Sequence, residues 1–448
     1  MIGIETSERM RLLEMQKSRR QGFYGWKMLA VVCIVLFANS GFPMYGGSVI
    51  NTYMAASLHF DRSELGLVFA LFQFMLALPA PLAAICINKK GVRFTLVLGT
   101  FLIVAGALVM AVLVRNPIQA YLGFGIMIGL GSLAGGPLTA QAGIARWFVK
   151  RRALAFSLIL TCGGTGGLIA PPLLNWIIES LHGNWRVAWW FVAGITFVSA
   201  LLALFFVKEW PSDVGQLPDG ASSAEPGLSA ASSNVRAAVY RTTEHWTFAE
   251  VWRTSTFWLL FLSSLGFLSG FTIYLAHGVI HLRDLGYTPA QAAFSLSVMT
   301  LCSLAGTLLV GGLGDHIEPR LLMAAALLLF GGGMLLAVHA AGALGLYLYA
   351  ILLGAGFGIA YPCFMTLAAN YFGEKAFPSV LGALLSIGTI GTSLSAFGAG
   401  YLYDHFGSYA DAFYAVSVLC FLGFLLMLWI KPPVRQRLRP LVAAGAER

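Results

Sequence analysis

Long apolar stretches dominate this chain, and each is long enough to cross a lipid bilayer as an α-helix, which takes about 20 residues. We count twelve such stretches, at approximately 26–47, 63–87, 93–114, 117–142, 152–178, 187–207, 256–280, 290–314, 320–340, 344–369, 377–402 and 410–431. A transmembrane β-barrel is excluded because its strands are only about 10 residues long and alternate in polarity. A water-soluble domain is excluded because 10% charged residues is far below the usual ~25%. We therefore expect an all-α integral membrane protein with twelve transmembrane helices.

The basic residues predict the orientation of the chain. Of the 28 Lys and Arg residues, only Arg62, Arg115, Arg186 and Arg283 lie in the connections on one side of the predicted membrane. An excess of Lys and Arg marks the cytoplasmic side, so both termini are expected in the cytoplasm. The net charge of +9 then reflects topology and the lipid bilayer, and we expect no nucleic-acid partner. The first span lacks a cleavage site and is expected to remain as an anchor.

A change of composition divides the chain into six spans plus six. The segment GQLPDGASSAEPGLSAASSN between the sixth and seventh spans is typical of a flexible linker, and TFAEVW after it predicts a short interfacial helix. The predicted units are a cytoplasmic segment (1–25), a six-helix bundle (26–207), a cytoplasmic linker (208–252), a second six-helix bundle (253–431) and a cytoplasmic tail (432–448).

The two halves resemble each other at a near-constant offset. Trp147-Phe148 matches Tyr371-Phe372 at 224 residues, and Gly164-Thr165 matches Gly388-Thr389 at the same shift. A six-helix unit repeated in one orientation is typical of transporters whose halves rock around a central cavity. The glycine-rich fourth and tenth spans, GFGIMIGLGSLAGGPL and GAGFGIAYP, favour closely packed helices that slide. Static packing would also use such glycines, and chance similarity between apolar sequences is the alternative to a repeat.

Motifs for catalysis or for a bound metal are missing from the sequence. It has no GxxxxGK[ST] phosphate loop, and GGTGG lies inside a span. The six cysteines form no CxxC pair or Cys/His cluster and are interpreted as small packing residues. We expect no enzyme activity, no cofactor and no metal site.

The chain resembles the major facilitator superfamily over its whole length, and two loops carry the superfamily's motif. The loop after the second span reads Ala84-x-x-x-Asn88-Lys89-Lys90-Gly91-x-Arg93, a degenerate copy of that superfamily's G-x-x-x-D-[RK]-x-G-[RK]-[RK] loop. The second-half equivalent, Gly311-x-x-x-Asp315-His316-x-x-x-Arg320, is closer. The resemblance implies the superfamily's two-bundle fold and a gating role for these loops. Asn88 replaces the acidic residue of the first copy.

Within that superfamily the chain is most similar to the monocarboxylate transporters and the oxalate/formate-type exchangers. The matches are Phe23-Tyr24-Gly25-Trp26 before the first span and Arg146-Trp147-Phe148-Val149-Lys150-Arg151-Arg152 before the fifth. The basic run, with Lys150, Arg151 and Arg152, is assigned to gating. The alternative is that these residues only set the orientation of the chain in the membrane.

The family's ionic residues are absent here. Ser303 and Thr307 stand at the positions of its eighth-span Asp and Arg, and Met44 follows Pro43 where a Lys is common. No Lys or Arg lies between Pro378 and Leu402, where the oxalate exchangers have a fixed cation.

Polar residues within the spans remain as candidates for solute binding, because no charged residue lies near the centre of any span. The candidates are Asn39, Tyr45, Gln73, Tyr274, His277, Ser303, Thr307, Tyr361 and Thr389. His277 shares a helix face with His281, and we interpret it either as a titrating gate residue or as an interfacial histidine wetted by the outer vestibule. Asn39 and Gln73 either contact solute or bond to a neighbouring helix, and the Ser303 and Thr307 hydroxyls either contact solute or bond to carbonyls one turn earlier.

These features predict a secondary active transporter of a small organic acid, monocarboxylate-like, driven by protons or by exchange. A carrier of a neutral or amphipathic solute is the alternative, favoured by the missing cations, and a transport-inactive membrane receptor is another. We expect a monomer in a bacterial cytoplasmic (inner) membrane.

Overall fold

The computed structural model describes residues 23–148, 152–220, 240–242, 244, 246–313, 316–340 and 342–433, all of them in helices or short connections. The N-terminal half contains α2 (Tyr24–Leu36), η1 (Phe37–Gly46), α3 (Gly47–Leu58), α4 (Arg62–Ala77), α5 (Ala80–Lys90), α6 (Val92–Val112), α7 (Pro117–Ala120), η2 (Tyr121–Ile128), α8 (Gly129–Ala134), α9 (Pro137–Trp147), α10 (Arg152–Ser180) and α11 (Trp185–Phe206). The short helices η3 (Pro211–Val214), η4 (Pro218–Gly220) and α12 (Phe248–Trp252) follow. The C-terminal half contains α13 (Ser255–Asp284), α14 (Pro289–Leu313), α15 (Pro319–Val338), α16 (Gly342–Phe406) and α17 (Ala410–Trp429).

The expected number of membrane spans is confirmed. Eleven helices within the described ranges are long and apolar enough to cross a membrane, and α4 with α5 makes a twelfth span bent by 44°. Element α16 contains two of the eleven spans, which are separated at Gly373, where a positive φ of 76° breaks the helix. The short helix predicted from TFAEVW is observed as α12. Most of the predicted flexible linker lies outside the described residues.

The first span is longer than expected and irregular. It runs from Tyr24 to Leu58, where the apolar pattern predicted 26–47, and its middle is the π-helical segment η1. Pro43 lies inside η1 and has no N–H to donate, so the ordinary helical ladder is interrupted there. The segment also packs backbone to backbone against α10, since a Cβ on Gly41 would lie 2.4 Å from the Cα of Gly166. The polar residues after Gly47 are buried inside the protein, which lets the helix extend beyond its apolar run.

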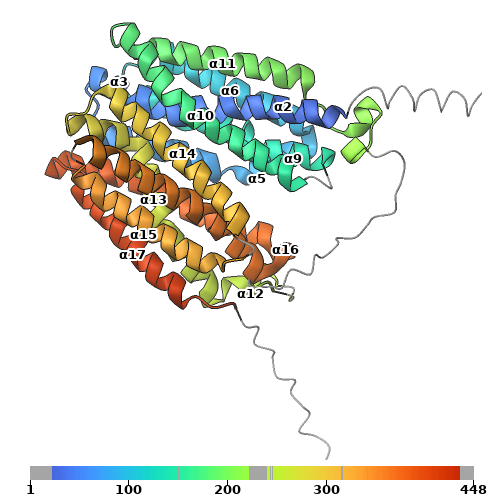
Figure 1. Cartoon of the computed structure of the whole chain (residues 1–448). Helices are drawn as coiled ribbons and strands as arrows, with labels where there is room; N and C mark the ends of the chain where they lie inside the picture. Colours follow the sequence, from blue (N-terminus) through green and yellow to red (C-terminus); the bar gives the residue numbers. More distant parts are fainter. Residues whose placement is uncertain are drawn as a thin grey trace, which may run out of the picture.

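The helices form two bundles, one from each half of the chain (Figure 1). The ribbons approach each other at the end of the molecule where α3 lies and diverge toward the end where α9 and α12 lie. The helix packing agrees, because α4 contacts both α13 and α16, and α3 contacts α13. We call the end with α12 the linker face and the end where α3 is followed by α4 the far face.

Two tight connections place the charged residues of the far face. His59, with a left-handed φ of 56°, ends α3, and α4 begins only three residues later at Arg62. In the other half, α13 ends at Asp284, and Gly286 turns the chain with a φ of 90°. Both turns project their charged neighbours into the region between the bundles.

Candidate functional site

A layer of aromatic side chains links the two bundles near the middle of their spans. Tyr45 of η1 packs edge-on against Phe271 of α13, with ring centroids 6.4 Å apart. Phe271 stacks on Phe357 at 4.1 Å, and Phe357 stacks on Tyr361 at 5.7 Å, both from α16. We call Tyr45, Phe271, Phe357 and Tyr361 the aromatic layer. Aromatic faces bind apolar and aromatic groups, and the phenol hydroxyls add polar ends.

Gln73 forms a polar contact between the halves. Its Nε2 lies 3.4 Å from the Thr272 hydroxyl of α13, beside Phe271 in the sequence. Its Oε1 is buried and has no hydrogen-bond partner within the described part of the chain. A buried acceptor without a partner costs free energy, so this oxygen is suited to accept a hydrogen bond from a ligand or water.

Fixed charge is missing from the middle of the spans. Among the residues that the structure describes, every Asp, Glu, Lys and Arg lies outside the spans or within about one turn of a span end. A solute at the aromatic layer would therefore meet rings, hydroxyls and amides. Any carboxylate-binding charge must lie closer to a membrane face.

The side chains of Asn39 and Tyr274 form hydrogen bonds within their own bundles. Asn39 is buried, and its Nδ2 donates to the Thr100 hydroxyl at 2.8 Å and to the Gly135 carbonyl at 2.9 Å. These are the bonds to neighbouring helices that formed one of its two interpretations. Tyr274 donates to Ser295, whose Oγ lies 3.2 Å away and itself donates to a carbonyl.

The hydroxyls of Ser303, Thr307 and Thr389 lie in the C-terminal half. Thr307 donates to the Ser303 carbonyl at 3.0 Å, and Thr389 donates to the Leu385 carbonyl at 2.7 Å. Both bonds run to the carbonyl one turn earlier, as the alternative interpretation for Thr307 expected. Ser303 packs its backbone against Gly358 of α16, where a Cβ would lie 2.0 Å from the Ser303 carbonyl oxygen.

His277 is not wetted by an outer vestibule, which corrects one of its two interpretations. It is completely buried, because Ala396 of α16, Tyr409 before α17 and Gly66 of α4 lie against its ring. Its Nε2 lies 2.9 Å from the Ala396 carbonyl oxygen and so must carry a proton, which leaves Nδ1 of the neutral ring to accept from the Tyr409 hydroxyl at 3.1 Å. His281 is also buried and donates to the Ala337 carbonyl at 2.8 Å.

An ion pair joins the two bundles at the far face. One guanidinium nitrogen of Arg62, on α4, lies 2.8 and 3.0 Å from the two carboxylate oxygens of Asp284, at the end of α13. Asp404, near the end of α16, accepts from the backbone amides of Arg62 and Ser63, both at 2.9 Å. We call Arg62, Asp284 and Asp404 the far-face cluster. It connects α4 of one half to two helices of the other.

Small residues allow the bundles to touch behind this cluster. A Cβ on Gly400 would lie 2.2 Å from the Arg62 carbonyl oxygen, and a Cβ on Gly66 would lie 2.4 Å from the Ala396 carbonyl oxygen. Backbone therefore packs on backbone between α4 and α16, as close helix pairs in membranes require.

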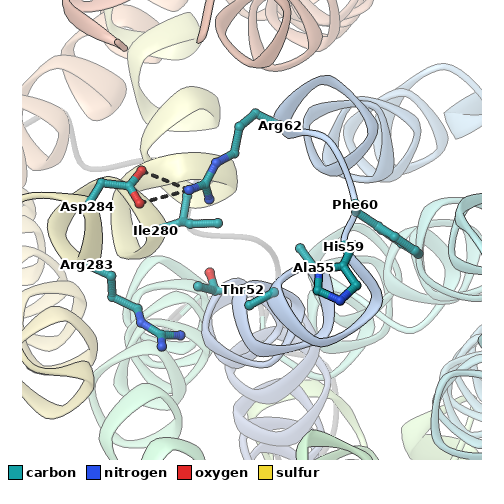
Figure 2. A pocket seen from close by; sticks show the side chains of 9 residues that line it. Thr52, Ala55, His59, Phe60, Arg62, Ile280, Arg283 and Asp284 are labelled. Atoms are coloured by element: carbon teal, nitrogen blue, oxygen red, sulfur yellow. Dashed lines mark hydrogen bonds and ion pairs between the residues drawn. The ribbon is translucent and has the colours of Figure 1, made fainter. Parts of the chain in front are cut away.

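A pocket of about 450 Å³ opens beside the far-face cluster, between α3 and α13 (Figure 2). Arg62 and Arg283 line it together with Asp284, which follows Arg283 directly in the sequence, and Ala55 and Ile280 supply apolar wall. Its size lies within the ~300–1,000 Å³ of typical ligand sites. Two of the four arginines on the sparsely charged side of the chain thus converge here, a clustering that their sequence positions did not reveal.

Comparison with known proteins identifies the family. The sequence profile of the Major Facilitator Superfamily matches residues 28–282 and, again, residues 262–447. The chain belongs to the Major Facilitator Superfamily.

The curated relatives of this superfamily member include monocarboxylate transporters. It is 28% identical over 354 residues to monocarboxylate transporter 13 of Bos taurus, covering 77% of this chain and 75% of the relative. It is 26% identical over 311 residues to monocarboxylate transporter 12-B of Danio rerio, covering 66% and 62%. These likenesses confirm the resemblance to the monocarboxylate transporter group and indicate a transporter of small solutes rather than an enzyme.

Solved structures of transporters share the fold. A mutant of the nucleoside transporter NupG superposes with a TM-score of 0.68 at 14% identity, covering 90% of this chain and 100% of that one. A bacterial homolog of the human lysosomal transporter Spinster, solved in an inward-facing and occupied conformation, gives 0.67 at 15% identity, covering 92% and 97%. At such identities the likeness establishes the fold alone.

The superfamily loop of the N-terminal half is completed by a residue that the loop pattern does not contain. Asn88 and Lys89 are exposed at the end of α5, and Gly91 turns the chain with a φ of 92°. The carboxylate of Glu209, after α11, accepts from the Arg93 amide at 2.7 Å and pairs with Arg146 at 2.5 Å. The sequence predicted an acid-free loop at Asn88, and Glu209 was not recognised because it is more than 100 residues away.

The other loop positions are less fully described. Arg320 donates to the Ile430 carbonyl at 3.1 Å, and Gly311 has open space where a Cβ would be. Lys150, Arg151 and Asp315 lie outside the described residues, as does the side chain of Arg152.

Proposed function

We propose that this superfamily member moves a small, monocarboxylate-like organic acid across the cytoplasmic membrane by alternating access, coupled to protons or to exchange. The observation that carries the proposal is its likeness to monocarboxylate transporter 13 over about three quarters of both chains. The basic lining of the far-face pocket supports it, because Arg62 and Arg283 would attract a carboxylate.

The arrangement of contacts fits a rocking cycle. The bundles are held together at the far face by the far-face cluster, while their ribbons diverge at the linker face (Figure 1). We infer that this is the state closed to the outside, with the linker face in the cytoplasm, as the excess of Lys and Arg on that side predicts. Opening the far face would separate the polar contacts of the far-face cluster and the backbone packing at Gly66 and Gly400.

The proposed organisation follows the predicted units. Two six-helix bundles, 26–207 and 253–431, would rock about the solute, joined by the linker 208–252, with segments 1–25 and 432–448 in the cytoplasm. The protein would act as a monomer in the inner membrane. The aromatic layer and Gln73 would hold the body of the solute.

A neutral or amphipathic solute is the second candidate, and one observation favours it. No charged side chain lies near the aromatic layer among the described residues, so the central contacts are those suited to an uncharged ring or chain. A receptor that has lost transport is a third possibility from a different class.

Uptake into proteoliposomes tests these alternatives. The panel would pair pyruvate, lactate, oxalate and benzoate with neutral amides of matched size, with and without an inward proton gradient. Uptake of carboxylates that exceeds uptake of the amides would support the organic-acid transporter. Uptake of the amides alone would contradict it in favour of a neutral solute, and no uptake with intact, folded protein would favour the receptor.

A further inference from the structure

The pocket on the far face has the composition of a binding site for a short carboxylate. The guanidinium groups of Arg62 and Arg283 line the pocket, and Ala55, Phe60 and Ile280 supply apolar parts of its wall (Figure 2). A short organic acid is complementary to this lining, because it has an anionic end and an apolar body. The volume of about 450 Å³ leaves room for both parts.

Arg283 holds unused hydrogen-bonding capacity in this pocket. Its guanidinium lies over the Tyr53 ring, 4.7 Å from the centroid, which orients the group and joins α13 to α3. Its Nη1 is buried, with no hydrogen-bond partner in the part of the chain that the structure describes. A buried guanidinium N–H without an acceptor is costly, so a carboxylate oxygen placed there would gain a charge-assisted hydrogen bond.

Arg62 is paired, but with a partner that can be exchanged. The side chain of Asp284 is 30% exposed, whereas that of Arg62 is 19% exposed. If the pair separates, water can solvate Asp284 more easily than Arg62, which needs another anion in place. A solute carboxylate can supply that anion, whereas a neutral molecule cannot.

We propose that the far-face pocket is a carboxylate-binding site separate from the aromatic layer, in which the solute binds Arg283 and replaces Asp284 on Arg62. The proposal rests on the function proposed above and adds a first contact for the solute on the outer side. Other charged groups nearby are Glu179, which lies 3.3 Å from the Tyr53 hydroxyl, and Asp404, which is occupied by backbone amides. Neither competes directly for Arg283 Nη1 among the described contacts.

Equilibrium binding to the full-length protein in lipid nanodiscs tests the site. The probes are radiolabelled pyruvate and benzoate, with their neutral amides and equal concentrations of sodium chloride as controls. We expect Arg283→Gln to raise the dissociation constant of both acids about tenfold, the scale of one charge-assisted hydrogen bond. Arg283→Lys should retain part of the affinity. Arg115→Gln removes another far-face arginine, one outside the pocket, and should change the constant by less than about twofold.

Asp284→Asn gives the decisive result, because the change is a gain that misfolding cannot produce. Removing the competing carboxylate should lower the dissociation constant of the acids severalfold and leave the amides unaffected. Unchanged or weaker acid binding in Asp284→Asn, or equal effects of Arg283→Gln and Arg115→Gln, would overturn the proposal. If either of these outcomes is found but the wild-type protein still transports acids, the proposed function stands without this site. If the wild-type protein neither binds nor transports acids, the proposed function itself has failed.

Discussion

The carboxylate of Asp404 accepts a hydrogen bond from the backbone amide of Arg62 at 2.9 Å, although the two residues belong to different halves of the chain. A second bond from the Ser63 amide completes the contact. The first amides of a helix have no partner within it, so the C-terminal half caps a helix of the N-terminal half. Closure of the far face therefore satisfies backbone groups that would otherwise need water.

Asp404→Ala is expected to favour opening of the far face. Loss of a helix cap costs about 1 kcal/mol, which would shift the balance of closed and open states roughly fivefold. Hydrogen–deuterium exchange of the first turn of α4 should become correspondingly faster. The control is Asp411→Asn, an exposed acid in the first turn of α17; equal exchange in both variants would contradict a capping role for Asp404.

Gly400→Ala is expected to prevent close approach of α4 and α16. The new methyl group would lie 2.2 Å from the Arg62 carbonyl oxygen, whereas a methyl group on Gly398 of the same helix would meet nothing within 4 Å. Overpacking of this kind costs about 1–3 kcal/mol. Uptake should fall in Gly400→Ala and remain close to wild type in Gly398→Ala. Similar uptake by the two variants would show that the far face does not need this contact.

Replacing Tyr361 tests the aromatic layer. Tyr361→Leu removes the ring that stacks on Phe357 at 5.7 Å, and stacked aromatic pairs contribute about 0.5–1.5 kcal/mol. The concentration of solute for half-maximal uptake should rise about two- to tenfold, with less effect on the maximal rate. Tyr361→Phe keeps the ring and should remain close to wild type. A larger loss in Tyr361→Phe than in Tyr361→Leu would mean that the hydroxyl, rather than stacking, contacts the solute.

Glu209→Gln is expected to destabilise the N-terminal bundle. The carboxylate pairs with Arg146 and accepts from the Arg93 amide, and both ionic side chains are mostly shielded, at 19% and 26% exposed. Leaving the Arg146 guanidinium without its anion should cost about 1–3 kcal/mol of the free energy of unfolding. A lower unfolding temperature of the purified protein would record this loss. Asp411→Asn is again the matched control. An equal unfolding temperature for both variants would contradict a stabilising role for Glu209.

His277 is expected to affect the pH dependence of uptake, if the proposed proton coupling acts through it. Its neutral ring donates to Ala396 and accepts from Tyr409. Burial raises the pKa of the Tyr409 phenol, so its hydroxyl stays protonated and able to donate across physiological pH. Adding a proton to Nδ1 would remove the acceptor and break this arrangement beside Arg62, Asp404 and His281, the charged or titratable groups around it.

His277→Gln tests whether His277 titrates or has only a structural role, since the amide can still donate a hydrogen bond but has no proton to titrate. Uptake measured between about pH 5 and 8 should lose its pH dependence in this variant and in His277→Ala. His281→Gln serves as the control and should preserve the profile. A wild-type profile in His277→Gln would assign the residue a purely structural role and place any proton coupling elsewhere.

The sequence by itself determined the class of the protein, its twelve spans, the division into repeated halves and the family. These properties can be predicted from short stretches of chain. The apolar length needed to cross a bilayer and the asymmetry of Lys and Arg can both be counted without knowing which residues are in contact. The loop pattern around Gly91 and the aromatic-Phe pair at Trp147 and Phe148 are equally local.

Only the tertiary structure decided which polar residues meet. Arg62 pairs with Asp284 across 222 positions, and its amide bonds to Asp404 across 342. Glu209 supplies the acid that Asn88 lacks, and the burial of His277 depends on Ala396 and Tyr409. Hydropathy and charge counts record how many such groups lie at each membrane face. Their pairing depends on how two rigid bundles dock, which no single span encodes.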